Sequence, residues 1–160
     1  MKPLNSGISV RRCLPLIFGL SFAGFIVSVS AGRVAAQTPA ESLPGITRGV
    51  TEQGFAYMTG GVGSGEREKM QSLAGEYNLK LSFAETSGVY ISDVRLLIAR
   101  DGRQVVQTIT NGPWFYIKLP PGMYSVEATY ENQTKRIENL EIGEGVRVTR
   151  LIHWPAEKQS

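Results

Sequence analysis

The chain of 160 residues has little of two side chains that often carry chemistry, with one cysteine, Cys13, and one histidine, His153. A single thiol excludes a disulfide within the chain, so the fold has to be stabilised by packing. A single imidazole excludes a histidine-rich metal site, and no Gly-x-Ser-x-Gly elbow accompanies it to build a nucleophilic triad. We therefore predict no catalytic residue, no metal and no cofactor, and we expect a structural or surface role for His153.

The first 36 residues have the pattern of a secretory signal. Lys2, Arg11 and Arg12 precede a long apolar run, which ends in the small residues Val-Ala-Ala. This pattern predicts cleavage after Ala36 and a periplasmic or secreted protein. The apolar run is also long enough to cross a bilayer, so a retained leader would act as a membrane anchor. We expect no other contact with a membrane.

An excess of basic charge is absent once this leader is set aside. The whole chain has 17 basic and 14 acidic residues, a net charge of +3. Four of the basic residues, Lys2, Arg11, Arg12 and Arg33, lie in the leader, which contains no acid. Without them 13 basic residues stand against 14 acidic ones, a net charge of −1. The sequence therefore predicts no nucleic-acid partner.

Only one segment of the remaining chain has a helical pattern. Residues 37–50 are rich in Pro, Ser, Thr and Gly and are predicted to be a flexible linker. Residues 51–78 are predicted to form a glycine-rich loop and the helix, with Ser64 as its N-cap. The expected apolar stripe of the helix consists of Met70, Leu73, Ala74 and Tyr77.

Beyond Asn78 the apolar residues recur with a period of two, which is typical of half-buried strands. Asp101-Gly102 is a hairpin signal, and Pro120-Pro121-Gly122 favours a type II turn. The segments with strand character are 79–85, 89–99, 103–110, 114–119, 123–130, 135–142 and 146–154. These patterns predict a mainly β protein, an antiparallel seven-strand β-sandwich with one N-terminal helix. Residues 156–160 are expected to be a tail.

The glycine-rich segment resembles the start of a dinucleotide-binding unit, because it has the order strand, glycine loop, helix and strand. Glu85 lies where a ribose-binding acid would stand. However, the glycines Gly61, Gly63 and Gly65 do not have the Gly-x-Gly-x-x-Gly spacing. Glu66 follows them, and its charge would repel a phosphate. No further helix is available for a doubly wound sheet, so we predict a turn that leads into the covering helix.

A family resemblance is carried by residues 101–142. An aromatic strand leads into Leu-Pro-Pro-Gly-Met-Tyr at 119–124, followed by an alternating strand, a polar turn and a return strand. This run resembles the carboxypeptidase regulatory-like domain, a prealbumin-like (transthyretin-like) β-sandwich, over roughly residues 79–153. The resemblance implies a prealbumin-like domain at 79–155 that serves as a binding or accessory module. It does not imply peptidase chemistry, because the domain is named for its position beside a catalytic domain.

The aromatic run Trp114-Phe115-Tyr116 supplies the candidate site. With a period of two, Phe115 faces the core, whereas Trp114, Tyr116 and Lys118 share the other face. If that face is uncovered, these three residues form a partner-binding surface, since aromatic residues dominate hot spots. The alternative is that the helix stripe of Met70 and Leu73 covers the pair.

Two functions remain open at this point. The first is a non-enzymatic exported β-sandwich module with a protein, peptide or glycan partner. The alternative is a small carboxylate-dependent hydrolase or lyase on the sandwich surface. It would require a cleft lined by at least two of Asp93, Asp101, Glu85, Glu127 and Glu131.

Overall fold

The computed structural model describes residues 42–156. The predicted signal at 1–36, the first part of the predicted linker at 37–41 and the end of the tail at 157–160 lie outside the described residues. The strands are β1 Ser42–Leu43, β2 Ile46–Val50, β3 Ala56–Gly60, β4 Leu79–Glu85, β5 Arg95–Arg100, β6 Arg103–Ile109, β7 Trp114–Ile117, β8 Gly122–Tyr130, β9 Gln133–Ile142 and β10 Val148–Trp154. The helices are α1 Ser64–Leu73 and the 3-10 turn η1 Ala74–Glu76.

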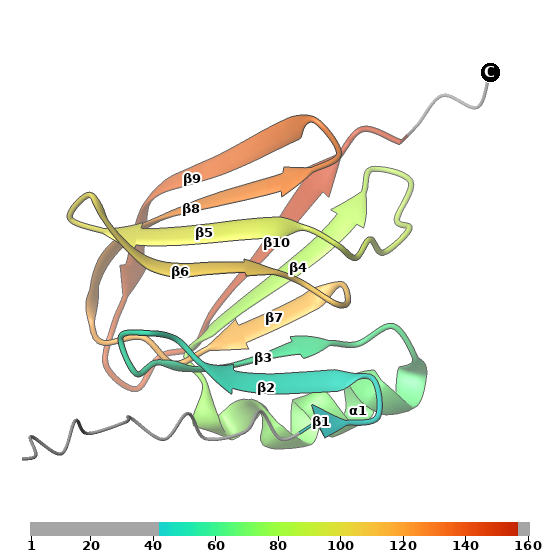
Figure 1. Cartoon of the computed structure of the whole chain (residues 1–160), viewed down its shortest axis with the longest axis horizontal. Helices are drawn as coiled ribbons and strands as arrows, with labels where there is room; N and C mark the ends of the chain where they lie inside the picture. Colours follow the sequence, from blue (N-terminus) through green and yellow to red (C-terminus); the bar gives the residue numbers. More distant parts are fainter. Residues whose placement is uncertain (1–41, 157–160) are drawn as a thin grey trace, which may run out of the picture. The chain divides into compact units, whose positions relative to one another are not determined.

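The strands form two sheets, as Figure 1 shows. One has six strands in the order β1-β2-β3-β7-β4-β10, and the other has four in the order β6-β5-β8-β9. In Figure 1, α1 lies beside β1, β2 and β3, on the side away from the four-stranded sheet. The protein is therefore mainly β, sandwich-like and carries one α-helix, as the sequence predicts.

The strand count and the linker prediction need correction. Each of the seven predicted strands has a counterpart in β4–β10, but the total of seven is wrong, because β1, β2 and β3 precede them. Residues 42–50 are thus not a flexible linker, since they hold β1 and β2. Backbone pairing of β2 with β3, and of β3 with β7, makes these segments strands.

The sandwich is also not wholly antiparallel. β10 pairs with β4 in parallel over seven residues, from Val148–Leu79 to Trp154–Glu85. The connection after β9 crosses from the four-stranded sheet to the six-stranded sheet, where the Val148 amide donates to the Asn78 carbonyl at 2.8 Å. Alternation along a strand predicts which side chains are buried, but it does not predict the direction of its neighbour.

The main core lies between the two sheets and follows the predicted alternation. Phe115 and Ile117 of β7 meet Tyr124, Val126 and Ala128 of β8 there, all of them buried. The β5–β6 hairpin also turns as predicted. Asp101 and Gly102 have φ angles of 51° and 73°, and two successive positive values are the mark of a type I′ turn. The predicted type II turn is wrong, because Gly122 has φ 156° rather than about 80°.

A second core lies between the six-stranded sheet and α1. The predicted helix stripe is confirmed: Met70, Ala74 and Tyr77 are buried, and Leu73 packs against them. The helix begins differently from the prediction, because Gly63 is the N-cap and Ser64 is the first helical residue. The sheet contributes the outer face of its central strands, in the buried side chains of Ile46, Met58, Trp114 and Tyr116.

Arg147 fixes the end of the helical segment to the sheet. Its guanidinium donates to the carbonyl oxygens of Ala74 and Tyr77 at the end of the helical segment, where carbonyl groups run out of partners within the helix. A salt bridge between Arg48 of β2 and Glu76, at 2.6 Å, is a second contact between the sheet and the helical segment. The helix is therefore held over the aromatic face of the sheet by charges as well as by apolar contact.

We expect Trp114→Ala to lower the free energy of unfolding by about 3–5 kcal/mol, because it opens a cavity in the second core. Chemical denaturation measures this loss. Lys118→Ala is the matched control, since Lys118 lies close by in the chain and is exposed. A loss below about 1 kcal/mol for Trp114→Ala would contradict the burial described above.

Candidate functional site

The predicted surface of Trp114, Tyr116 and Lys118 does not form. Trp114 is 6% exposed and Tyr116 is 1% exposed, because the helix stripe covers both. The Lys80 ammonium lies over the same rings, 3.4 Å from the Trp114 centroid and 5.4 Å from the Tyr116 centroid. Lys118 is exposed but lies at one end of the sandwich, so it does not join the aromatic pair in a common surface.

Lys80 is a cation at the margin of the second core. Burial lowers the pKa of its ammonium group, and the nearby charge of Arg147 lowers this pKa further. The cation–π contacts with Trp114 and Tyr116 act in the opposite direction, because they favour the charged form. Lys80 thus completes the cover over the aromatic pair.

Backbone amides of the glycine-rich loop already bind a carboxylate of the same chain. The Glu66 carboxylate accepts hydrogen bonds from the amides of Gly61 at 3.2 Å and Val62 at 3.0 Å. Arg67 donates back to the carbonyl oxygens of Gly61 and Val62. Two loop amides that a phosphate would need are therefore occupied by Glu66.

Four of the five carboxylates of the hydrolase alternative have local partners. Glu127 pairs with Arg136 at 2.5 Å, and Asp101 lies 3.6 Å from Arg100. The hydroxyl groups of Ser92 and Ser87 donate to Asp93 and Glu85, and Glu131 stands in the β8–β9 turn. Across residues 42–156, no group of three or more His, Cys, Asp or Glu side chains could hold a metal ion.

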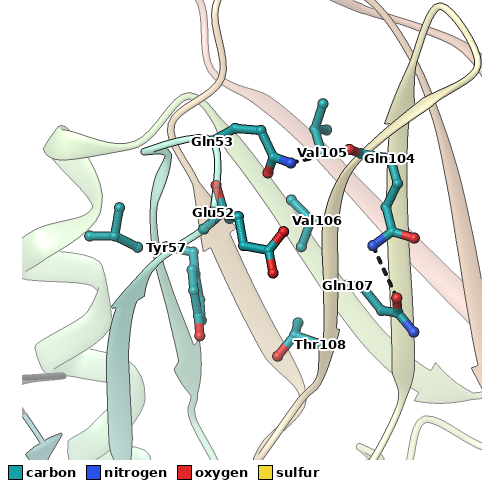
Figure 2. A pocket seen from close by; sticks show the side chains of 10 residues that line it. Glu52, Gln53, Tyr57, Gln104, Val105, Val106, Gln107 and Thr108 are labelled. Carbon is teal, nitrogen blue, oxygen red and sulfur yellow. Dashed lines mark hydrogen bonds between the residues drawn. The ribbon is translucent and has the colours of Figure 1, made fainter. Parts of the chain in front are cut away.

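A polar cleft lies where the two sheets part, between β6 and the β2–β3 hairpin. It has a volume of about 280 Å³. We call it the seam cleft; it is lined by Val50, Thr51, Glu52, Gln53, Tyr57, Gln104, Val105, Val106, Gln107 and Thr108. Figure 2 shows the Glu52 side chain pointing into the space between Tyr57 on one wall and Val106 and Thr108 on the other.

The β2–β3 loop presents Glu52 and Gln53 on a rigid turn. The Thr51 amide donates to the Phe55 carbonyl at 2.9 Å, and the Gly54 amide donates to the Thr51 carbonyl at 2.8 Å. The Phe55 amide also donates to the Thr51 hydroxyl at 3.1 Å. Gly54 has φ 86°, a conformation that favours glycine. The backbone positions that carry the two polar side chains are therefore fixed by the turn.

Polar side chains span the cleft and its rim. Gln53 donates from its amide nitrogen to the Gln104 carbonyl of β6 at 3.5 Å, and Gln104 donates to the Gln107 side chain at 3.0 Å. Of the described residues that line the cleft, Glu52 alone carries a charge, and it forms no ion pair with another residue of 42–156. The cleft therefore offers amide and hydroxyl groups together with one free carboxylate.

Tyr57 supplies a ring edge to the cleft rather than a ring face. One face of the ring stacks on Phe115, with centroids 5.6 Å apart and an interplanar angle of 22°. Gly49 lies against the ring, so closely that a Cβ at this position would stand 2.7 Å from the Tyr57 Cζ atom. Both neighbours hold Tyr57 in place, and little ring surface is left for a ligand to stack on.

A second, more apolar hollow contains Lys118. We call it the end groove, with a volume of about 470 Å³; it is lined by Gly54, Phe55, Ala56, Asn78, Lys118, Leu119, Pro120, Pro121, Gly143, Glu144 and Gly145. Asn78 builds its floor, since its amide group donates to the Leu119 carbonyl at 2.7 Å and accepts from the Leu119 amide at 2.9 Å. The groove is open, and the hydrogen-bonding groups of its Asn78 side chain are already bonded to the Leu119 backbone.

Compared with protein-family models and with the curated proteins, the chain matches none. Between residues 42 and 156, no helix is both long and apolar enough to cross a membrane. The seam cleft was not predicted from the sequence, because its walls lie about 50 residues apart in the chain. A Thr-Glu-Gln-Gly loop between two strands is the one local signal that points to it.

Glu66→Ala should lower the free energy of unfolding by about 1–2 kcal/mol, because it leaves the Gly61 and Val62 amides without an acceptor. Glu68→Ala is the control in the same helical turn, since Glu68 is exposed. Thermal or chemical denaturation of both variants measures the difference. Equal stability of the two variants would show that the glycine loop does not depend on Glu66.

Proposed function

We propose that the chain is a non-enzymatic, exported binding module with a prealbumin-like β-sandwich, and that the seam cleft is its ligand site. The observation that carries the proposal is a polar cleft between β6 and the β2–β3 hairpin, with an unpaired carboxylate on a hydrogen-bonded turn. Sites of this kind give orientation and specificity through a small number of placed polar groups.

Two features support the assignment to a prealbumin-like domain. Seven strands, β4–β10, lie within residues 79–155, where the resemblance falls. The Leu-Pro-Pro-Gly-Met-Tyr run contains an internal hydrogen bond, in which the Tyr124 hydroxyl donates to the Pro120 carbonyl at 2.8 Å. The residues that carry the resemblance thus serve the fold. The proposed site joins residues 104–108 of β6, which lie inside that range, to the β2–β3 hairpin, which lies outside it.

A non-enzymatic role is favoured by the chemistry of the cleft. Glu52 is its single titratable carboxylate, whereas acid–base hydrolysis by carboxylates uses a pair. No imidazole or thiol lies among the described lining residues. The groups present can hold a ligand, but they do not supply a nucleophile with an adjacent base. Export rests on the N-terminal signal pattern, with a periplasmic or secreted location.

Binding to peptide and glycan arrays tests the proposal, with protein recovered after expression of the full chain. We expect a peptide or glycan signal that the double variant Glu52→Gln/Thr108→Val loses at least tenfold, since two polar contacts of about 1 kcal/mol each are removed and about 1.4 kcal/mol corresponds to tenfold. Lys118→Gln in the end groove is the control and should bind as the parent does.

Two outcomes would count against this function. A signal lost in Lys118→Gln and kept in the double variant would move the site to the end groove. Turnover of a bound peptide or glycan, abolished by substitution of a carboxylate such as Glu127, would show an enzyme instead.

A further inference from the structure

We propose that the seam cleft takes an extended polypeptide segment bearing a lysine or arginine, which adds as a strand to the free edge of β6 and places its cation on Glu52. This inference rests on the proposed function, and it names the class of ligand. It follows from the strand edge, from the side-chain contacts between the walls and from the charge of the lining.

The outer edge of β6 has no strand partner within residues 42–156, because β6 stands at the end of the four-stranded sheet. The Gln53 amide nitrogen reaches the Gln104 carbonyl across the cleft, so a donor on this side meets the strand backbone. Unpaired strand edges are templates for a further strand, with alternate N–H and C=O groups at fixed spacing. Only an extended polypeptide matches this spacing along its whole length.

The opposite wall contacts β6 and the residues after it through side chains. Asn111 beyond β6 donates to the Thr47 hydroxyl of β2 at 2.7 Å, and Gln53 bridges the other end. Both bridges use side chains, and no backbone hydrogen bond joins β2 to β6 in the described part of the chain. β2 is therefore not a strand partner of β6, and a segment that pairs with β6 would replace the Gln53 side chain at the Gln104 carbonyl.

A sugar fits the cleft less well than a peptide. Protein sites that recognise neutral rings use an open aromatic face, whereas Tyr57 is held between Phe115 and Gly49. The volume of about 280 Å³ is at the lower limit of small-molecule pockets, which are about 300–1,000 Å³. A short stretch of a longer chain can use such a space, because the rest of the chain continues outside it.

The charge of the cleft selects the side chain. Glu52 is exposed and unpaired among the described residues, so its carboxylate can accept from an ammonium or guanidinium group. Val50, which lies on the same cleft lining and is exposed, suits an apolar neighbour. Because side chains alternate along a strand, the fitting segment alternates β-branched residues with a cationic residue.

The test uses capped hexapeptides, because β6 has seven residues and spans about 23 Å at about 3.3 Å per residue. The first probe is acetyl-TVKVTV-amide, and the second has glutamate in place of lysine. A third has the lysine sequence with alternate backbone nitrogens methylated, which removes the strand donors. Affinity is measured by NMR titration, and the amide signals of residues 104–108 report the place of binding.

We expect the lysine peptide to shift the β6 amide signals and to bind about tenfold more tightly than either other probe. Glu52→Gln should remove the preference for lysine over glutamate, and Glu52→Lys should reverse it. Lys118→Gln should leave all three affinities unchanged. If N-methylation abolishes binding, the peptide binds by backbone pairing with β6. If binding persists, the contact is made through side chains alone.

Several results would overturn the inference. If chitohexaose shifts the β6 amides and no peptide does, the peptide inference fails and the proposed binding function stands. If neither peptides nor chitohexaose bind at the cleft, both fail. A concentration-dependent dimer whose interface is β6, seen by light scattering and loss of the same amide signals, would show that a second copy takes this edge.

Discussion

Burial of β7 on both of its faces is the constraint on which the rest of the structure depends. All four of its residues are buried, and it pairs with β3 on one side and β4 on the other. Phe115 and Ile117 enter the core between the sheets, whereas Trp114 and Tyr116 enter the core under α1. A strand with two apolar faces is stable only when a layer covers each of them. The four-stranded sheet and the helix are those two layers.

The need to cover β7 fixes the N-terminal part of the described chain. The helix has to reach the Trp114–Tyr116 face, so the chain turns tightly after β3, and Glu66 satisfies the amides of that turn. Arg147 then holds the far end of the helical segment. With β3 paired to β7, the β2–β3 hairpin extends the sheet past its partner layer. The positions of Glu52 and Gln53 therefore follow from the packing of residues far from them.

Prediction from sequence succeeded where the signal was local. The strands β4–β10 alternate with a period of two between turn residues, and the helix stripe falls at regular spacing, so both could be identified. β2 and β3 are short and contain Gly49, Gly60 and two threonines, and their strand character comes from the pairing of β2 with β3 and of β3 with β7. Alternation also placed Trp114 and Tyr116 on one face. It could not decide what covers that face, because cover depends on the path of the chain.

The seam cleft could not be predicted for a related physical reason. It exists because one sheet has six strands and the other has four, so β2 and β3 extend past the edge at β6. The strands that local patterns did not predict are the ones that create this overhang. A closed sandwich would bury the β6 edge within its own fold. Here the bulge at Val105 and the side-chain bridges at either end limit the exposed edge without pairing it, which leaves a short polar strand edge beside a free carboxylate.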